Sequence, residues 1–409
     1  MIDFSRPIRE LWVGVARRPT GTLVRQSQYE FTYDPGAGTP VSLIMPVEDG
    51  HFTDGELFAV MDMNLPEGFL LAAIRERAPK TSPTKMHLLA LMGENGIGWL
   101  GYRQPGAKRA ARLTGVSRDR LLREGAGKQG RLFAELVDAY LSTGSGLSGV
   151  QPKVLVPERT SIAVPNLIVK AAGADYPGLA ANEFLCLEVA TRAGLEVATH
   201  ALSDDGQLLL VDRFDLSNGA RLGFEDIAAL MDLRVGGALS DRKYRGSYED
   251  IARVIGLFST RKEADRARFF QHVALTVLLR NGDGHLKNFG VVYDETTCRL
   301  APVFDVVTTT IYPYERANGA RVTDRTLALK LRAGRDRRRR AYPAARDLAA
   351  FGRECCGVAE PRALVEPLFE AMVECLDAAR RDERIPRALV KQLRPEWEDS
   401  LRVWRPRTT

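Results

Sequence analysis

The sequence lacks the features that mark membrane, secreted and zinc-binding proteins. No apolar run approaches the roughly 20 residues that a membrane-spanning helix needs, and the N-terminus has no basic segment followed by an apolar stretch. The 5 cysteines include no C-x-x-C pair and no cluster of zinc ligands, and the adjacent Cys355 and Cys356 are poor disulfide partners. These absences argue against a bilayer-spanning helix and a disulfide framework. We therefore expect a protein of the reducing cytosol with no membrane partner.

Blocks of like charge and long low-complexity tracts are also missing. Of the 409 residues, 45% are hydrophobic, which is ordinary for a globular protein, and the charged residues are interspersed. The length exceeds the usual limit for one hydrophobic core, so we expect two or three domains or lobes. A net charge of +6 and a pI near 9.1 permit contact with nucleic acid without requiring it.

The most informative segment runs from Arg280 to Phe289 and reads RNGDGHLKNF. In it, Asp283 and Asn288 have the spacing of a kinase catalytic loop, in which the Asp accepts the proton of the attacking hydroxyl and the Asn holds a magnesium ion. Clusters of Asp, Gly and Asn also make ordinary turns, so the spacing alone is a weak signal. Apolar residues repeat at helical spacing between 269 and 278, and they predict a buried helix that leads into the loop.

Two strands are predicted after the loop, at 289–293 and 298–304, with a turn at 294–297 between them. A hairpin of this length can bring Asp305 back beside Asn288. Two oxygen ligands would then lie near the proposed base, an arrangement that suits magnesium carrying the phosphates of a nucleotide.

A glycine-rich segment lies further upstream. Gly144, Gly146 and Gly149 match G-x-G-x-x-G, but a predicted helix at 131–141 precedes them and extended chain at 150–157 follows them. A dinucleotide-binding fingerprint needs a strand before and a helix after, so that interpretation fails. The bare backbone of such a loop could cover phosphates, and the alternative is a flexible linker.

The segments between the two loops fit a nucleotide site. A predicted buried strand ends in Lys170, whose ammonium group needs an anionic partner such as a nucleotide phosphate; the alternative is a lysine that simply emerges at a strand end. The helix predicted at 181–192 carries Glu183 and Glu188, one of which could pair with that lysine. The strand predicted at 208–214 ends where a hinge between lobes is expected.

The order of these elements is that of a protein-kinase-like fold. We therefore expect an α+β protein of two lobes that bind Mg-ATP between them, with a mixed N-terminal lobe and an all-helical C-terminal lobe. The expected division is 1–105 for an extra N-terminal subdomain, 106–225 for the N-lobe and 226–409 for the C-lobe. In the extra subdomain, strands are predicted at 29–33 and 41–45.

The densest basic run is Arg335–Arg340. Such a run is usually a solvated surface, and the alternative is contact with the phosphate backbone of DNA. Only His285 among the histidines lies inside a motif, and His272 is predicted to be a core or helix-face residue.

Several short segments carry a more specific pattern: 64–68 (NLPEG), 91–98, 148–153 (SGVQPK), 166–170 (NLIVK), 182–184 (NEF), 212–215 (DRFD), 283–289 (DGHLKNF) and 303–305 (VFD). Together they resemble the HipA family of bacterial toxin kinases over nearly the whole chain. The resemblance implies a serine/threonine protein kinase that uses ATP and Mg²⁺ within a toxin–antitoxin system. The implied partner is a small helix-turn-helix antitoxin, HipB-like, that binds operator DNA. The implied substrates are aminoacyl-tRNA synthetases, whose phosphorylation arrests growth.

The resemblance also implies roles for individual residues. Asp283 would be the catalytic base, and Asn288 and Asp305 would be the magnesium ligands. Lys153 and Lys170 would bind phosphates, and residues 212–214 would contact adenine. The full set of implied nucleotide-binding residues is Ser148, Gly149, Val150, Gln151, Lys153, Lys170, Asp212, Arg213, Phe214, His285, Lys287 and Phe304.

One position departs from the family pattern. Members often carry an autophosphorylated serine in the glycine loop, at the position that Gly146 occupies here. Ser145 and Ser148 are the nearest hydroxyls, so autophosphorylation has either moved to one of them or been lost.

Three functions stay open on the sequence alone. The first is an active protein kinase toxin, the second a catalytically weak co-repressor that binds an antitoxin on DNA, and the third a small-molecule or lipid kinase on the same fold. The presence of Asp283, Asn288, Asp305 and Lys170 favours an active kinase, because a decayed kinase commonly loses one of these residues.

Overall fold

The computed structural model of the protein describes residues 3–77, 82–107, 115–126, 132–133, 135–137, 153–158, 165–173, 176–217, 219–315, 319–334 and 340–404. Outside these residues lie the glycine-rich segment with Ser145, Ser148, Gly149, Val150 and Gln151, and residues 335–339 of the basic run.

The chain forms two compact units, each assembled from several segments. The first comprises Met1–Ala171, Leu210–Lys243 and Val292–Thr297, and the second Ala172–Leu209, Tyr244–Val291 and Cys298–Thr409. The linear division expected at residues 105 and 225 stays a prediction.

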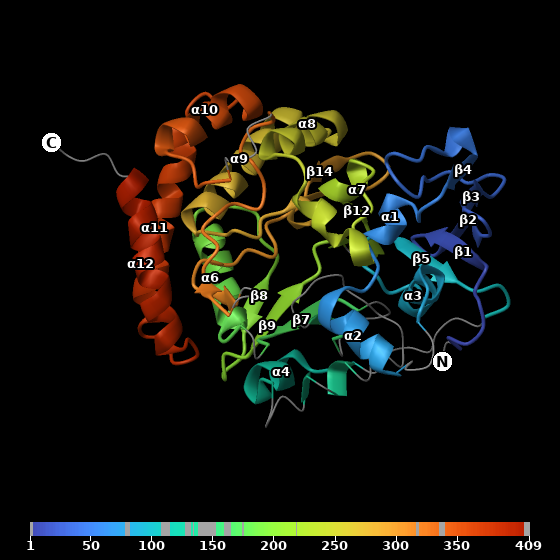
Figure 1. Ribbon diagram of the computed structural model, residues 1–409, viewed down its shortest axis with the longest axis horizontal. Helices are drawn as coiled ribbons and strands as arrows, with labels where there is room; N and C mark the ends of the chain where they lie inside the picture. The colour runs from blue at the N-terminus through green and yellow to red at the C-terminus, as the bar shows by residue number, and fades with distance from the viewer. Residues whose placement is uncertain are drawn as a thin grey trace. The chain divides into compact units, whose positions relative to one another are not determined.

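The first unit contains a five-stranded antiparallel sheet in the order β4-β3-β2-β1-β5 (Figure 1). Its strands are β1 (Glu10–Val15), β2 (Arg18–Arg25), β3 (Tyr29–Tyr33), β4 (His51–Asp54) and β5 (Leu100–Arg103). Alternate residues of β1 and β3 are buried, so one face of these strands packs on the core. The strand predicted at 29–33 is confirmed as β3.

The helices of the N-terminal part are α1 (Ala59–Asp62), α2 (Gly68–Arg77) and α3 (Lys85–Met92). The interruption between α1 and α2 falls at Pro66, as expected for a residue that cannot donate the next helical hydrogen bond.

The strand predicted at 41–45 is wrong. The chain turns there and forms a single bridge between Ser42 and Met45, after which η1 (Val47–Asp49) begins. The buried carboxylate of Glu225 accepts hydrogen bonds from the Ser42 hydroxyl and the Leu43 N–H, both at 2.7 Å. A side chain from a distant segment thus satisfies a backbone donor that a strand would use in a ladder.

The remaining elements of the first unit are α4 (Arg118–Glu124), β6 (Lys153–Val156), β7 (Leu167–Ala171), β10 (Leu216–Ser217), β11 (Ala220–Arg221), β12 (Gly223–Asp226) and α7 (Ile227–Leu230). Every residue of β6 and β7 is buried, which confirms the predicted buried strand that carries Lys170. The chain passes from one unit to the other within β9 (Leu208–Asp212), η3 (Gly237–Tyr244) and β13 (Gly290–Tyr293).

The second unit is mostly helical. The predicted all-helical C-terminal lobe is wrong in this respect, because short strands lie between residues 290 and 322. The helices of the second unit are α6 (Leu179–Arg192), α8 (Tyr248–Phe258), α9 (Lys262–Leu278), η4 (Leu286–Asn288), α10 (Ala345–Cys356), α11 (Pro361–Ala379) and α12 (Arg387–Trp404). Its short strands are β8 (His200–Leu202), β14 (Cys298–Leu300), β15 (Tyr314–Glu315) and β16 (Arg321–Val322). Helix α9 packs against α8, α10 and α11, and α11 also packs against α6 and α12 (Figure 1). No helix in the described ranges is both long and apolar enough to cross a membrane.

The predicted hairpin after the loop at 280–289 is confirmed, but its second strand is shorter than expected. Strand β14 ends at Leu300, whereas the prediction extended to residue 304. Beyond it, the Val303 N–H donates to the Glu196 carbonyl at 2.8 Å, and Val303 forms a parallel bridge with Val197. The chain therefore leaves the hairpin because its backbone finds a different partner.

Candidate functional site

Helix α9 delivers the loop that contains Asp283. Its apolar residues between 269 and 278 are buried, and the Phe269 ring lies edge-on to Phe289 at 5.3 Å and to Phe351 at 6.5 Å between ring centroids. The helix ends just before Arg280, whose φ of 55° is left-handed and turns the chain out of the helix. The predicted buried helix is thus confirmed, and it gives the loop a rigid base.

The loop itself is fixed by its own polar groups. The buried Asn281 accepts a hydrogen bond from the Asp283 N–H at 3.0 Å, and the Asp283 carbonyl accepts one from the His285 N–H at 2.7 Å. The Tyr248 hydroxyl donates to the Gly284 carbonyl at 2.9 Å. These bonds hold the main chain on both sides of Asp283 and leave its side chain half exposed, at 50%.

The Asp283 carboxylate faces two further side chains. Its Oδ1 accepts a hydrogen bond from the Tyr244 hydroxyl at 2.9 Å and lies 3.8 Å from Nε2 of His285. Sequence reasoning missed Tyr244, because it lies 39 positions upstream of Asp283 and belongs to no motif. A carboxylate that accepts a hydroxyl hydrogen bond is arranged as a general base must be.

Asn288 is buried at the end of η4. Its Oδ1 accepts the His285 N–H at 3.0 Å, and its own N–H donates to the His285 carbonyl at 2.9 Å. An amide oxygen has two lone pairs, so this hydrogen bond leaves room for a metal on the same atom. Lys287, also on η4, is half-buried.

Asp305 has a strained backbone conformation, and a residue shortly after it in the sequence forms hydrogen bonds with the loop at 280–289. Its φ of 53° is rare for a residue with a side chain, and such strain concentrates at functional sites. Four residues on, Thr309 Oγ1 accepts the Gly282 N–H at 2.7 Å and donates to the Arg280 carbonyl at 3.1 Å. These bonds attach the segment after Asp305 to the start of the loop at 280–289. Phe304, just before it, is half-buried.

The loop at 280–289 leaves little room for a side chain at Gly282. A Cβ there would lie 2.6 Å from the Thr326 carbonyl oxygen and 2.9 Å from Thr309 Oγ1. We expect Gly282→Ala to lower the free energy of unfolding by about 1–3 kcal/mol, the usual cost of overpacking. Gly256→Ala, within helix α8, is the matched control, because its Cβ would meet only Arg266 side-chain atoms at 3.8 Å. Urea unfolding of both variants measures the difference, and equal midpoints would contradict the packing argument.

In the first unit, two buried lysines lie directly opposite each other. Strands β6 and β7 pair antiparallel with Lys153 facing Lys170, and the two residues are 9% and 3% exposed. Like charges across a strand pair repel, and buried charges are costly. The implied phosphate-binding role of this lysine pair stays a prediction.

The side chains of residues 212–214 all contact other residues of the first unit. Asp212 forms an ion pair with Arg118, and the Phe214 ring lies edge-on to Phe224 at 5.5 Å. The implied adenine contact stays a prediction, and Asp212 already has a structural partner.

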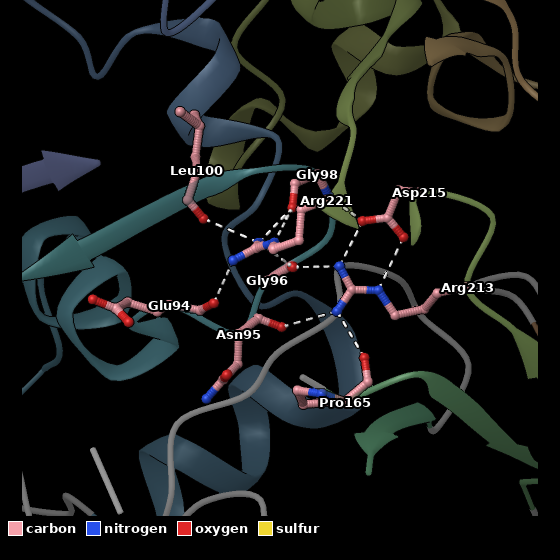
Figure 2. A network of polar contacts seen from close by, with 9 residues as sticks. All are labelled: Glu94, Asn95, Gly96, Gly98, Leu100, Pro165, Arg213, Asp215 and Arg221. Carbon is pink, nitrogen blue, oxygen red and sulfur yellow. Dashed lines mark hydrogen bonds and ion pairs between the residues drawn. The ribbon is translucent and has the colours of Figure 1, made fainter. Parts of the chain in front are cut away.

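Of these three side chains, that of Arg213 forms the most hydrogen bonds. Its Nε donates to Asp215 Oδ1 at 2.9 Å and its Nη2 to Oδ2 at 2.5 Å (Figure 2). The same guanidinium donates to the carbonyls of Gly96 at 2.8 Å, Pro165 at 3.0 Å and Asn95 at 3.5 Å. Because this side chain is committed to the fold, any adenine contact at Arg213 would come from its main chain.

A second buried guanidinium, that of Arg221, binds the same stretch of chain (Figure 2). It donates to the carbonyls of Glu94 at 2.5 Å, Gly96 at 2.9 Å, Gly98 at 2.8 Å and Leu100 at 3.3 Å. Burial and then the charge of Arg213 lower the pKa of Arg221 to about 9. The hydrogen bonds of Arg213 and Arg221 join residues 94–100 to residues 213–221. No pattern in the sequence predicted a structural role for Arg221.

Two further predictions concern α6 and α9. Glu188 forms an ion pair with His200 at 3.2 Å, and the pairing of Glu183 or Glu188 with Lys170 stays a prediction. The predicted core role of His272 is confirmed: the ring is 3% exposed, and burial, with a smaller effect from Arg268, lowers its pKa to about 3.

Comparison with known proteins begins with two family models. Residues 11–103 match the HipA N-terminal domain, and residues 145–380, more than half of the chain, match the HipA-like C-terminal domain. HipA of Shewanella oneidensis MR-1, solved in a complex of the toxin–antitoxin proteins HipA and HipB with their operator DNA, has the same fold. It matches with a TM-score of 0.69 and 17% identity over 96% of each chain.

Curated relatives match shorter stretches. A Sinorhizobium fredii protein named "Putative kinase Y4dM" is 33% identical over 161 residues, which are 36% of this chain and 38% of the relative. A Haemophilus influenzae protein named "Putative kinase" is 28% identical over 186 residues, 42% of this chain and 54% of the relative. The matched stretches thus cover about two fifths and about half of these relatives. On the strength of the two family models, the chain belongs to the HipA family.

Proposed function

We propose that this chain is a serine/threonine protein kinase toxin of a HipA-like toxin–antitoxin system, which transfers the γ-phosphate of ATP to a protein hydroxyl and to itself. The observation that carries the proposal is the loop after α9. It holds the half-exposed Asp283 on a buried scaffold, and hydrogen bonds of Thr309 attach the segment after Asp305 to it. The kinase names of two relatives support the same reaction.

The residues of the loop fit a magnesium ion. In the described ranges, no group of three or more His, Cys, Asp or Glu side chains could hold a metal. Magnesium does not need one, because it is commonly held by one or two protein oxygens together with water and substrate phosphates. The Asn288 amide and the Asp305 carboxylate would supply those oxygens. When bound, the ion neutralises phosphate charge and orients the transferring group.

The other residues act by binding and by moving a proton. Asp283 would accept the proton of the acceptor hydroxyl, which is worth about 10²–10⁴ in rate for a general base. Lys153 and Lys170 would bind phosphates, with their ammonium groups already desolvated by the strands around them. His285 and Lys287 would line the nucleotide site.

We also propose a helix-turn-helix antitoxin of the HipB type as the partner, through which the chain would reach operator DNA. Support comes from the Shewanella structure, which contains HipB and operator DNA. An aminoacyl-tRNA synthetase is the proposed protein substrate. Proteome-wide phosphopeptide mapping after brief induction, with wild type set against Asp283→Asn, tests this choice.

Asp305→Asn should weaken magnesium-dependent binding of ATP by about tenfold or more, because it removes a charged metal ligand. Calorimetry with ATP in the presence and absence of Mg²⁺ measures the effect. Asp347→Asn, an exposed position on α10, is the matched control and should bind Mg-ATP as wild type does. If wild-type protein freed of phosphate failed to bind Mg-ATP at millimolar concentration, the kinase proposal itself would fail.

A further inference from the structure

We propose that Tyr244 is a phosphate acceptor of the chain's own kinase site, an inference that rests on the proposed function. The Tyr244 hydroxyl donates to Oδ1 of Asp283 at 2.9 Å. A general base must accept a hydrogen bond of about this length, roughly 2.6–3.2 Å, from the group whose proton it removes. Tyr244 therefore already makes the contact that defines an acceptor hydroxyl.

The fold holds this tyrosine in place by two further contacts. The Tyr244 carbonyl accepts a hydrogen bond from Arg340 Nη2 at 2.8 Å, and its ring lies edge-on to His285 with 5.2 Å between ring centroids. One contact fixes the main chain and the other fixes the ring. The approach of the phenol to Asp283 is thus a property of the packed structure rather than of a loosely placed side chain.

A neighbouring tyrosine shows that proximity to the loop alone is not enough. The Tyr248 hydroxyl also bonds the loop, but its partner is the Gly284 carbonyl, which cannot act as a base, and its side chain is fully buried. Tyr314, on β15, is 47% exposed and serves as a reference for unspecific modification. Among these three, only Tyr244 combines a bond to the candidate base with partial exposure.

The proposed step balances without a further reactant. The Tyr244 oxygen forms a bond to the γ-phosphorus while its proton passes to Asp283. The bond from that phosphorus to the oxygen bridging the β-phosphate breaks, and ADP leaves with its electron pair. The phosphotyrosine carries about −1.5 to −2 charges and would repel the Asp283 carboxylate. It should therefore move away and give another hydroxyl access to the base.

Mass spectrometry tests the proposal on the full chain. Protein first treated with a phosphatase is incubated with Mg-ATP, and its phosphorylated residues are mapped by peptide sequencing. We expect phosphate on Tyr244 at about a hundredfold or more over Tyr314, because a positioned acceptor gains from proximity. Asp283→Asn should slow this labelling by about 10²–10⁴-fold, and Tyr244→Phe should remove the labelled peptide.

The outcomes separate the two proposals. Phosphate on serines or threonines without Tyr244, or equal labelling of Tyr314, would overturn the acceptor role and leave the kinase function standing. Neither phosphate nor ADP formed from Mg-ATP would overturn both.

A measurement without nucleotide tests the geometry directly. The tyrosine doublet in the Raman spectrum distinguishes a phenol that donates a hydrogen bond from one that does not. The difference spectrum between wild type and Tyr244→Phe should show a donating phenol, and the same signal should disappear in Asp283→Ala. A non-donating Tyr244 in the wild-type protein would overturn the inference whatever the kinase assay gives.

Discussion

Asparagine in place of Asp283 should abolish phosphoryl transfer by this chain, with a loss of about 10²–10⁴-fold in rate. The substitution removes the negative charge that lets the side chain accept the proton of the attacking hydroxyl, but it keeps the shape of the side chain. Its amide oxygen can still accept the hydrogen bond from Tyr244, so the loop should keep its structure. Magnesium-dependent nucleotide binding should persist, because the proposed metal ligands are Asn288 and Asp305.

The measurement is ADP formation and phosphate incorporation at saturating Mg-ATP, together with thermal unfolding of each protein. Asp347→Asn on α10 makes the same chemical change at an exposed position and should behave as wild type. If Asp283→Asn kept more than about a tenth of the wild-type rate, Asp283 would not be the essential base.

Alanine in place of Asp215 should lower the free energy of unfolding by about 3–5 kcal/mol, the cost of breaking a buried ion pair. The side chains of Asp215 and Arg213 are 1% and 0% exposed, and this carboxylate also accepts the Gly98 N–H at 2.6 Å. Without it, the buried charges of Arg213 and Arg221 would lose the carboxylate that offsets them, and a backbone donor would lose its acceptor.

Urea unfolding followed by intrinsic fluorescence measures this loss. Glu124→Ala is the control in the same unit: its carboxylate is 51% exposed and lies 2.9 Å from Arg120. We expect that change to cost under about 1 kcal/mol, since exposed ion pairs contribute little. A similar midpoint for both variants would show that the buried network contributes no more than a surface pair.

Local patterns in the sequence predicted the parts of the fold that depend on local order. The buried helix before the loop at 280–289 and the buried strand that carries Lys170 both follow from the pattern of apolar residues, and both are confirmed. The spacing of Asp283 and Asn288 likewise identified the loop that carries the candidate site.

Contacts between distant segments could not be predicted in this way. Thr309 bonds the loop 27 positions upstream, Tyr244 meets Asp283 across 39, and Arg221 reaches Gly98 across 123. Each of these contacts depends on one side chain whose partner comes close only when the chain folds. A periodic pattern in the sequence therefore cannot predict it. The wrong prediction of a strand at 41–45 has the same cause. The carboxylate of Glu225, 182 positions away, accepts the Leu43 N–H that a neighbouring strand would otherwise bind.

The two buried arginines have a consequence for whether residues 11–103 of this chain could be moved to another protein. They belong to the stretch that matches the C-terminal family domain, yet the carbonyl oxygens they bind, at residues 94–100, lie in the stretch that matches the N-terminal domain. A gene fusion that moved residues 11–103 to an unrelated protein would transfer those oxygens without the guanidinium groups that satisfy them. In this chain, residues 11–103 therefore depend on Arg213 and Arg221 for hydrogen bonds to these carbonyl oxygens.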